Sequence, residues 1–375
     1  MKEKPSFAAT VEGYCDCGPL VSIVMPVFNT AGTIGQTLGS VTKQTYSNIE
    51  IICVDDGSTD GSKEAIMDIC VRDERLLCID NVGKGAGAAR NTGLSFANGK
   101  YILFLDSDDL FDREMVATEV ARMERDELDV LIVSAFLWTE DTGKLERRTE
   151  DVEKERLIEE GIELFNPSEC PAPLFSIFSN VLWDKMFRVD YLRSKHLECL
   201  ETMTCNDCYL SRASVVLASK VGISSYCPIR YRVNRGGGIT TSREKSPLDG
   251  MLSCEKLYEV ISNSGSMHFA VESIESFCIN ELVYRYLNYR SEDARNQIVE
   301  YWKSSPRLSR IDLKKGRVGV SFAYRLLYYS IVTSNGFSEI CEHIIRRTTG
   351  SKFLLMAMAC VFHPIRAFGE LLAEK

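Results

Sequence analysis

The sequence predicts an α/β protein with a mostly parallel mixed sheet, helices on both of its faces, and a helical region after it. Short apolar runs recur through the first hundred or so residues, as is typical of buried parallel strands. The segments between these runs repeat apolar residues at helical spacing, and from about residue 246 this spacing dominates. Alternating strands and helices favour a three-layer α/β/α arrangement.

Each expected element has its own signal. Strands are expected at residues 21–26, 49–54, 76–79 and 101–105, and residues 129–133 can extend the same sheet. Ile34, Leu38 and Val41 share one face of a helix after the first strand, and Ala65, Ile66, Ile69 and Cys70 do so after the second. Glycine-rich residues 83–93 open a third helix.

The later segments set the predicted domain organisation. Residues 146–160 are dense in charge and are interpreted as a solvated helix or loop. Residues 1–18 are expected to be a tail, 19–243 an α/β domain, and 244–375 a mainly α-helical region.

Composition excludes several classes of protein. The 375 residues are 45% hydrophobic and 26% charged, which is ordinary for a soluble globular protein. A net charge of −9 argues against a general nucleic-acid binder, which would be basic. The first residues contain no apolar core of a secretory signal, so the 14 scattered cysteines are expected to be reduced in a cytoplasmic protein.

One apolar run raises the question of a membrane. Residues 353–362 are apolar and follow basic residues, but the run stops at His363-Pro364. It is shorter than the roughly 18–20 residues that span a bilayer. A buried terminal helix is the favoured interpretation. The alternative is a helix lying on the inner face of the plasma membrane.

A cluster of acids follows the fourth expected strand. Asp106, Asp108 and Asp109 come directly after the apolar run 101–105. Ligands of open α/β sheets bind at the carboxyl ends of the strands. Two carboxylates separated by one residue can share a hard cation and leave positions for phosphate oxygens. The alternative is an acidic turn that only ends the strand.

Two further strand ends carry polar groups that belong on the same rim. These are Pro26–Asn29 and Asp55–Asp56. A carboxylate can accept a hydrogen bond from a nucleotide base, and a metal can neutralise a diphosphate. The three strand ends together are therefore suited to a nucleoside diphosphate.

Four segments carry a resemblance to a known family. Residues 21–29, 47–60, 85–93 and 103–109 resemble, in order and spacing, successive motifs of family 2 glycosyltransferases. The resemblance covers roughly residues 20–240. It implies a GT-A fold, a nucleotide-sugar donor with a UDP-sugar as first expectation, and transfer with inversion at the anomeric carbon. The acceptor implied is a glycan or a lipid-linked molecule, in polysaccharide or glycolipid biosynthesis.

The resemblance also implies roles for individual residues. Asp106 and Asp108 correspond to the metal-facing acids, for Mn²⁺ or Mg²⁺. The nucleotide-sugar contacts that it implies are Pro26, Val27, Phe28, Asn29, Asp55, Asp56, Arg90, Asn91, Asp106 and Ser107. Arg232 and Arg235, in the arginine- and glycine-rich segment 230–243, are further candidates for the donor diphosphate. Simpler alternatives stay open: Asp56-Gly57 as a turn, Arg90 as the partner of a surface acid, and Gly85 and Gly87 as packing glycines.

Inversion in one displacement requires a general base for the acceptor hydroxyl. The family often places it in an acidic pair that opens a later helix. The matching pair here is Asn206-Asp207, which leaves Asp207 as the candidate base. A helix-capping aspartate is the simpler interpretation. Cys205 and Cys208 flank this residue, with His196 and Cys199 upstream, so a structural zinc site is a further, disfavoured, hypothesis.

The segment 230–243 combines four arginines with three consecutive glycines, which suits either a loop over a diphosphate or a flexible basic linker. Trp183 and Lys185 are candidates for an acceptor wall or for the core. The leading hypothesis is a metal-dependent, inverting glycosyltransferase that transfers a hexosyl or N-acetylhexosaminyl group. The alternative is a non-catalytic relative that binds a nucleotide sugar in a glycan-assembly complex. A nucleotidyltransferase is disfavoured because no glycine-rich, lysine-containing loop follows the first strand.

Overall fold

The computed structural model describes residues 18–148, 152–233, 244–311, 328 and 331–332. Within them, the large sheet has eight strands in the order β3-β2-β1-β4-β10-β6-β11-β9. Its strands are β1 (Val21–Val27), β2 (Ile49–Asp55), β3 (Leu76–Asp80), β4 (Tyr101–Phe104), β6 (Val130–Ile132), β9 (Leu164–Phe165), β10 (Lys185–Arg188) and β11 (Val221–Ile223). Strand β10 runs antiparallel between β4 and β6, so the sheet is mixed but mostly parallel, as predicted.

A smaller sheet lies beside the large one. It contains β5 (Leu110–Phe111), β7 (Ala135–Thr139), β8 (Lys144–Arg147) and β12 (Ile229–Arg232), in the order β5-β12-β7-β8. Strand β5 comes directly after the acidic segment 106–109, and it pairs with β12 through Ile229 and Phe111. This pairing brings a strand from more than a hundred residues later against the acidic segment.

Helices cover both faces of the large sheet because alternate side chains of its strands point to opposite faces. Ile23 and Met25 of β1 share a core with α1 (Ile34–Val41), α2 (Ser62–Cys70) and α4 (Met115–Asp126). Val24 shares the other core with α3 (Gly85–Phe96), α6 (Val189–Ser194) and α7 (Cys208–Val216). The predicted three-layer fold is therefore confirmed.

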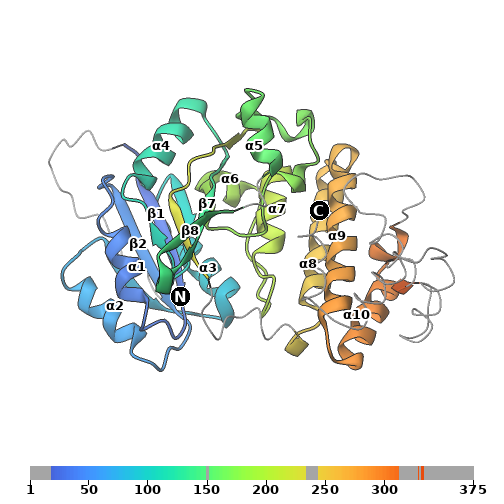
Figure 1. Ribbon diagram of the computed structural model, residues 1–375, viewed down its shortest axis with the longest axis horizontal. Helices are drawn as coiled ribbons and strands as arrows, with labels where there is room; N and C mark the ends of the chain where they lie inside the picture. The colour runs from blue at the N-terminus through green and yellow to red at the C-terminus, as the bar shows by residue number, and fades with distance from the viewer. Residues whose placement is uncertain (1–17, 149–151, 234–243, 312–327, 329–330, 333–375) are drawn as a thin grey trace.

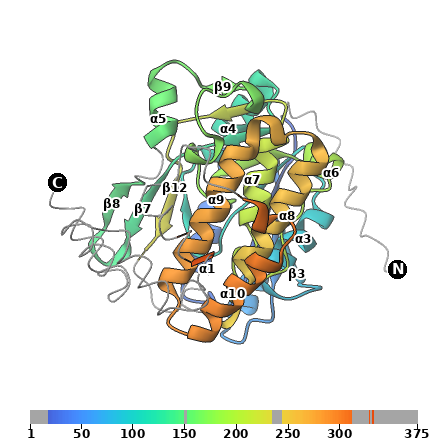
Figure 2. The same cartoon turned by 90° about the vertical axis from the view of Figure 1, so that its right-hand side faces the viewer.

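Three long helices form a further layer outside α7: α8 (Asp249–Ser264), α9 (Met267–Asn288) and α10 (Glu292–Ser304) (Figures 1 and 2). Their buried side chains, such as Leu257, Cys278 and Trp302, belong to the same continuous core as α7 and the sheet. Single-turn 3-10 helices lie at Glu140–Thr142, Pro167–Glu169, Leu174–Ser176 and Leu308–Arg310. Among the described residues, no helix is long and apolar enough to cross a bilayer. The predicted boundary near residue 243 and the apolar run 353–362 lie outside the described residues.

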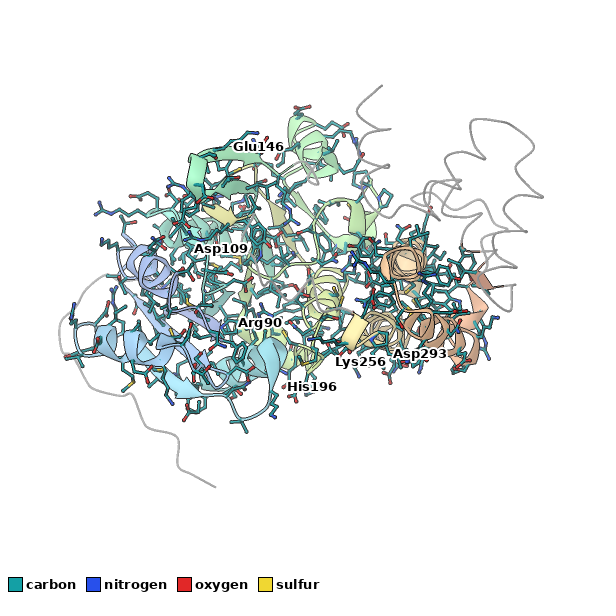
Figure 3. The ribbon with its side chains drawn as sticks, turned by 60° about the horizontal axis from the view of Figure 1, so that its bottom comes forward. Arg90, Asp109, Glu146, His196, Lys256 and Asp293 are labelled. Atoms are coloured by element: carbon teal, nitrogen blue, oxygen red, sulfur yellow. The ribbon has the colours of Figure 1, made fainter. Side chains whose placement is uncertain are left out.

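The charged segment 146–160 is only partly solvated, which corrects the sequence interpretation. Glu146 lies exposed on β8 (Figure 3), and helix α5 (Val152–Glu159) follows. Lys154 of this helix is completely buried, and its Nζ donates to the backbone oxygen of Val133 at 2.8 Å. A lysine can be buried when its long apolar stem packs in the core and its ammonium group has an acceptor.

Glu119 of α4 is a second buried charged residue, and it makes folding stability depend on pH. Both of its carboxyl oxygens are buried without a hydrogen-bond partner among the described residues. Burial, helped by Asp184, raises the pKa of Glu119 to about 8. The folded chain then binds one more proton than the unfolded chain between about pH 4.3 and 8. The contribution of this proton to the free energy of unfolding is therefore complete below about pH 4.3. It is lost progressively as the pH rises to about 8.

We expect Glu119→Gln to remove this dependence, because an amide does not titrate. The free energy of unfolding of the wild type should fall relative to the variant by up to about 1.4 kcal/mol per pH unit within the window. Urea unfolding of both proteins at several pH values between 5 and 8 measures the difference. Parallel stability curves for the two proteins would show that Glu119 is ionised in the folded state.

Candidate functional site

The ends of three neighbouring strands place the predicted polar segments on one rim of the sheet. In the parallel register, Val27 of β1 lies opposite Asp55 of β2, and Val24 lies opposite Phe104 of β4. The segments that follow these strands therefore leave the sheet at the same edge, the carboxyl edge at which open α/β sheets bind ligands.

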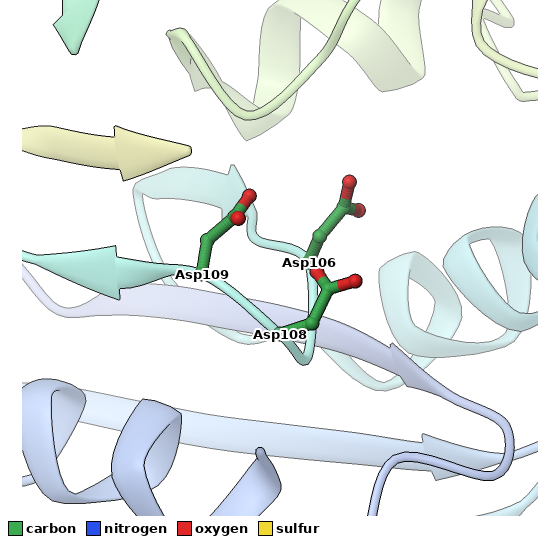
Figure 4. A group of neighbouring side chains, drawn as sticks. All are labelled: Asp106, Asp108 and Asp109. Carbon is green, nitrogen blue, oxygen red and sulfur yellow. The ribbon is translucent and has the colours of Figure 1, made fainter. Parts of the chain in front are cut away.

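Three carboxylates gather in the loop between β4 and β5 (Figure 4). One ligand oxygen from each of Asp106, Asp108 and Asp109 lies within 4.8 Å of the others. In the described part of the chain, this is the one group of three or more His, Cys, Asp or Glu side chains that could hold a metal ion. All donors are hard oxygens, which suit Mg²⁺ or Mn²⁺ better than zinc.

Asp109 extends the predicted pair of metal-facing acids. Its Oδ1 accepts a hydrogen bond from the backbone N–H of Arg232 at 2.8 Å, whereas its buried Oδ2 has no partner among the described residues. Burial, followed by repulsion from Asp106, raises the pKa of Asp109 well above its usual range. A cation between the carboxylates would relieve this repulsion. The residues therefore fit a divalent cation.

Arg90 connects the acidic loop to Asn206, the residue before the predicted base. It lies on α3, is buried, and donates from Nη2 to Asp106 Oδ1 at 2.8 Å and from Nη1 to Asn206 Oδ1 at 2.7 Å (labelled in Figure 3). Burial opposes its charge, but the surrounding acidic groups, Asp106 first among them, together raise the pKa of Arg90. Its partner is thus an acid of the candidate site, which argues against the interpretation as a surface ion pair.

Asp207 occupies the N-cap position of α7 without using its side chain as a cap. Its backbone oxygen accepts from Ser211, but its side chain makes no capping hydrogen bond. The simpler interpretation, a helix-capping aspartate, therefore does not account for it. Burial raises the pKa of Asp207 against the opposing effect of Arg90, and Asp106 raises it further. A carboxylate with a raised pKa is a stronger base than a solvated one.

The other rim residues on β1 and β2 hold the loops in place. Asp56 accepts from Asn81 Nδ2 at 2.7 Å and from the backbone N–H of Gly85 at 2.8 Å, so it supports the start of α3 rather than only a turn. Asn29, with a φ of 51°, accepts from the backbone N–H of Thr59 at 2.9 Å. The Asp55 carboxylate is buried and accepts from Ser58 N–H at 3.3 Å.

Phe28 is the residue of this rim that offers an open apolar surface. Its side chain is 57% exposed, whereas Pro26 is half-buried and Val27 is buried. An exposed aromatic ring on the same rim as the three carboxylates suits the face of a nucleotide base. The assignment of all four residues from Pro26 to Asn29 to the nucleotide stays a prediction.

Three of the other predicted contacts already have partners within the protein. The amide of Asn91 exchanges two hydrogen bonds with the backbone of Cys199, at 2.8 and 3.0 Å. Ser107 is buried, and its carbonyl oxygen accepts from Thr37 Oγ1 at 3.2 Å. Arg232 is buried, forms an ion pair with Glu140 and donates to the backbone oxygen of Asp108 at 2.9 Å. Arg235 lies outside the described residues.

The loop that precedes α7 explains why residue 87 is a glycine, and it carries the residues of the zinc hypothesis. A Cβ on Gly87 would clash with the backbone oxygen of Leu200, so this glycine allows α3 to pack closely against the loop. The four candidate zinc ligands, His196, Cys199, Cys205 and Cys208, do not form a metal-binding group. The ten cysteines in the described ranges are all free thiols.

Trp183 is buried in the core, which favours the core over the acceptor wall as its role. The rings of Trp183 and Tyr231 stack with centroids 5.4 Å apart, and the Arg148 guanidinium lies 5.3 Å from the Trp183 ring centre. Lys185 is buried and bonded to Asp184, so its ammonium is not available to an acceptor. The sequence placed Asp109 in the acidic cluster without a ligand role, and Tyr231 was not selected. Both follow or precede residues that it selected, and adjacency was the available signal.

Comparison with known proteins identifies the family. Residues 22–185 match the model described as Glycosyl transferase family 2. This part of the chain is a family 2 glycosyltransferase domain. The match includes the ends of β1, β2 and β4 and the whole acidic loop. Asp207, α7 and the three outer helices lie beyond it.

Relatives of this domain are named as glycosyltransferases. Glycosyltransferase GlyA of Streptococcus pneumoniae is 26% identical over 216 residues, which cover 58% of this chain and 31% of GlyA. The UDP-Glc:alpha-D-GlcNAc-diphosphoundecaprenol beta-1,3-glucosyltransferase WfaP of Escherichia coli is 44% identical over 110 residues, which cover 29% of this chain and 43% of WfaP. The chain thus aligns with less than half the length of these relatives.

A solved structure extends the likeness beyond the family 2 domain. Residues 1–349 of S. aureus TarS superpose with a TM-score of 0.62 at 16% identity, covering 90% of each chain. At this identity the comparison shows a shared fold. The GT-A fold expected from the sequence motifs is therefore confirmed.

Proposed function

We propose that this protein is a metal-dependent, inverting glycosyltransferase that moves a sugar from a UDP-sugar to a hydroxyl group. The observation that carries the proposal is the arrangement around Arg90. This one side chain bonds Asp106 of the acidic loop and Asn206, the neighbour of Asp207. A leaving-group site and a candidate base are therefore held on the two sides of a single arginine.

The donor side of the proposal rests on the rim. The exposed Phe28 and the buried Asp55 would contact the base, and the acidic loop would receive the diphosphate of the donor. Asp106 and Asp108, with Asp109 beside them, would hold the cation. When bound, this cation would neutralise the charge that develops on the diphosphate as it leaves. The UDP in the name of WfaP, and a TarS complex with UDP-GlcNAc, favour a UDP-sugar.

On the acceptor side, Asp207 removes the proton from the attacking hydroxyl while the oxygen of that hydroxyl forms a bond to the anomeric carbon. The bond from that carbon to the diphosphate breaks in the same displacement, and UDP leaves. The raised pKa of Asp207 suits a base in this role. Tyr231, which stacks on the buried Trp183, offers an exposed aromatic surface for the acceptor, and the name of WfaP is consistent with a lipid-linked glycan.

The alternative is a relative that binds a nucleotide sugar without transferring it. It would keep the acidic loop but would have no use for a carboxylate at position 207. The Asp207 side chain makes no capping hydrogen bond to α7, and this favours the enzyme over the non-catalytic alternative.

Calorimetric titration with UDP tests the donor side. Binding should tighten at least about tenfold when Mn²⁺ is present, since the diphosphate then gains a cation ligand, and EDTA should reverse the gain. Release of UDP from UDP-glucose or UDP-N-acetylglucosamine then separates the two functions. Binding without any turnover would favour the non-catalytic alternative. A Kd for UDP that is the same with and without Mn²⁺ would contradict the proposed site.

A further inference from the structure

The loop before α7 is tied, residue by residue, to three different elements. Its backbone closes on itself through a hydrogen bond from Leu200 N–H to the Asn206 oxygen at 3.0 Å. Thr204, Cys205 and Asn206 then each contact a different helix: α8, α9 and α3, respectively. The next residue is Asp207. The position of the candidate base is therefore set by three consecutive neighbours.

The contact with α8 is made by a buried carboxylate. Asp249 Oδ2, in the first turn of α8, accepts from the backbone N–H of Thr204 at 2.8 Å and from its hydroxyl at 3.2 Å. Both residues are buried. Hydrogen bonds to a buried charged group are stronger than neutral ones, so this anchor contributes more than an ordinary loop contact.

The contact with α9 is made by Arg285, which is almost completely buried. Its Nη2 lies 2.7 Å from Cys205 Sγ, its Nε bonds Glu281 Oε1 at 2.5 Å, and its Nη1 bonds the Tyr289 hydroxyl at 2.5 Å. The guanidinium thus has fixed partners on α9 and directs its remaining nitrogen at the loop. Gly250 of α8 leaves the space, because a Cβ there would clash with Arg285 and Glu281.

Cys205 shows why the loop needs an anchor at this point. Its φ of 53° lies in the left-handed region, which is disfavoured for a residue with a Cβ. A strained backbone conformation persists only where its surroundings hold it. Arg285 contacts the side chain of this strained residue.

We infer that Arg285 is a positioning residue for Asp207, and that α8 and α9 form part of the active site. This inference rests on the proposed function in that Asp207 is the base. Arg285 does not touch a substrate in this scheme. It fixes Cys205, and through Cys205 it fixes the angle at which Asp207 faces Arg90 and the acidic loop.

Hydrogen exchange tests the holding of the loop without any ligand. The variant is Arg285→Met with Glu281→Gln, so that no buried charge is left unpaired. The control is Arg307→Met, which removes an arginine paired with Glu255 at 2.7 Å on the same helical layer. We expect amides of residues 200–211 to exchange at least about tenfold faster in the variant and unchanged in the control. Equal exchange in variant and control overturns the inference.

Turnover tests the positioning role. With UDP-N-acetylglucosamine and UDP-glucose as probes, the variant should lower kcat about a hundredfold, while the Kd for UDP with Mn²⁺ stays unchanged. In an Asp207→Asn background the same change should have almost no further effect, because there is no base left to position. Cys205→Ser, which keeps an acceptor for Arg285, should retain most activity.

The outcomes separate this inference from the proposed function. If the loop loosens but kcat is unchanged, or falls equally in the Asp207→Asn background, Arg285 is structural only and the inference is wrong. If the wild type binds no UDP, the proposed function fails, and the exchange measurement still decides whether Arg285 holds the loop.

Discussion

Replacing Asp108 with asparagine is expected to remove the metal-dependent part of UDP binding and to lower turnover of the UDP-sugar by about a thousandfold. Asp108 is buried, and its carboxylate lies within 4.8 Å of those of Asp106 and Asp109. The amide keeps the shape of the side chain but loses the negative charge that attracts a hard cation. Calorimetry with UDP and Mn²⁺, together with UDP release from the sugar donor, measures both effects.

Asp80→Asn is the matched control for this variant. Asp80 ends β3, opposite Asp55 on the same rim, but its carboxylate is exposed and pairs with Lys63. We expect this change to leave UDP binding and turnover close to those of the wild type. Equal losses in the two variants would mean that the acidity of the whole rim attracts the donor, and that the acidic loop holds no specific cation.

The donor side could be predicted because its signals are local. Buried parallel strands appear as apolar runs, and the residues after them must meet at one edge. Asp55 and Asp106 could therefore be placed together from spacing alone. Asp109 was not assigned to the metal because its environment is not local. Its partner, the backbone N–H of Arg232, comes from β12, 123 residues later in the sequence.

The buried charged residues were not predicted from the sequence, because their partners also lie far away in the chain. Lys154 lies in a run of charged residues, and its burial depends on the backbone oxygen of Val133, which no charge pattern reveals. The contacts that fix the loop before Asp207 span 45 residues from Thr204 to Asp249 and 80 from Cys205 to Arg285. Helical spacing predicted that α8 and α9 exist. It carried no information about the face that meets the α/β domain.

Replacing Asp207 with asparagine is expected to lower sugar transfer by about 10²- to 10⁴-fold, the range typical of a lost general base. The Kd for UDP with Mn²⁺ should not change, because Asp207 is not one of the three acids of the cation group, and its neighbour Asn206 and the acidic loop bind different nitrogens of Arg90. In the wild type, activity should rise with pH as Asp207 ionises. Burial places this rise above the usual pH range of an aspartate, although Arg90 opposes the shift. The residual activity of the variant should lack this rise.

Asp190→Asn provides the comparison that separates a base from a helix-terminal charge. Asp190 is an exposed acid in the first turn of α6, so its loss removes a charge near a helix start without touching the site. Favourable charges at helix starts contribute only about 0.3–1 kcal/mol of stability, and Asp190→Asn should therefore leave kcat unchanged. If Asp207→Asn resembles it, with a small loss of stability and normal transfer, Asp207 is a structural residue of α7. A large loss of kcat with intact UDP binding is the result that only a base predicts.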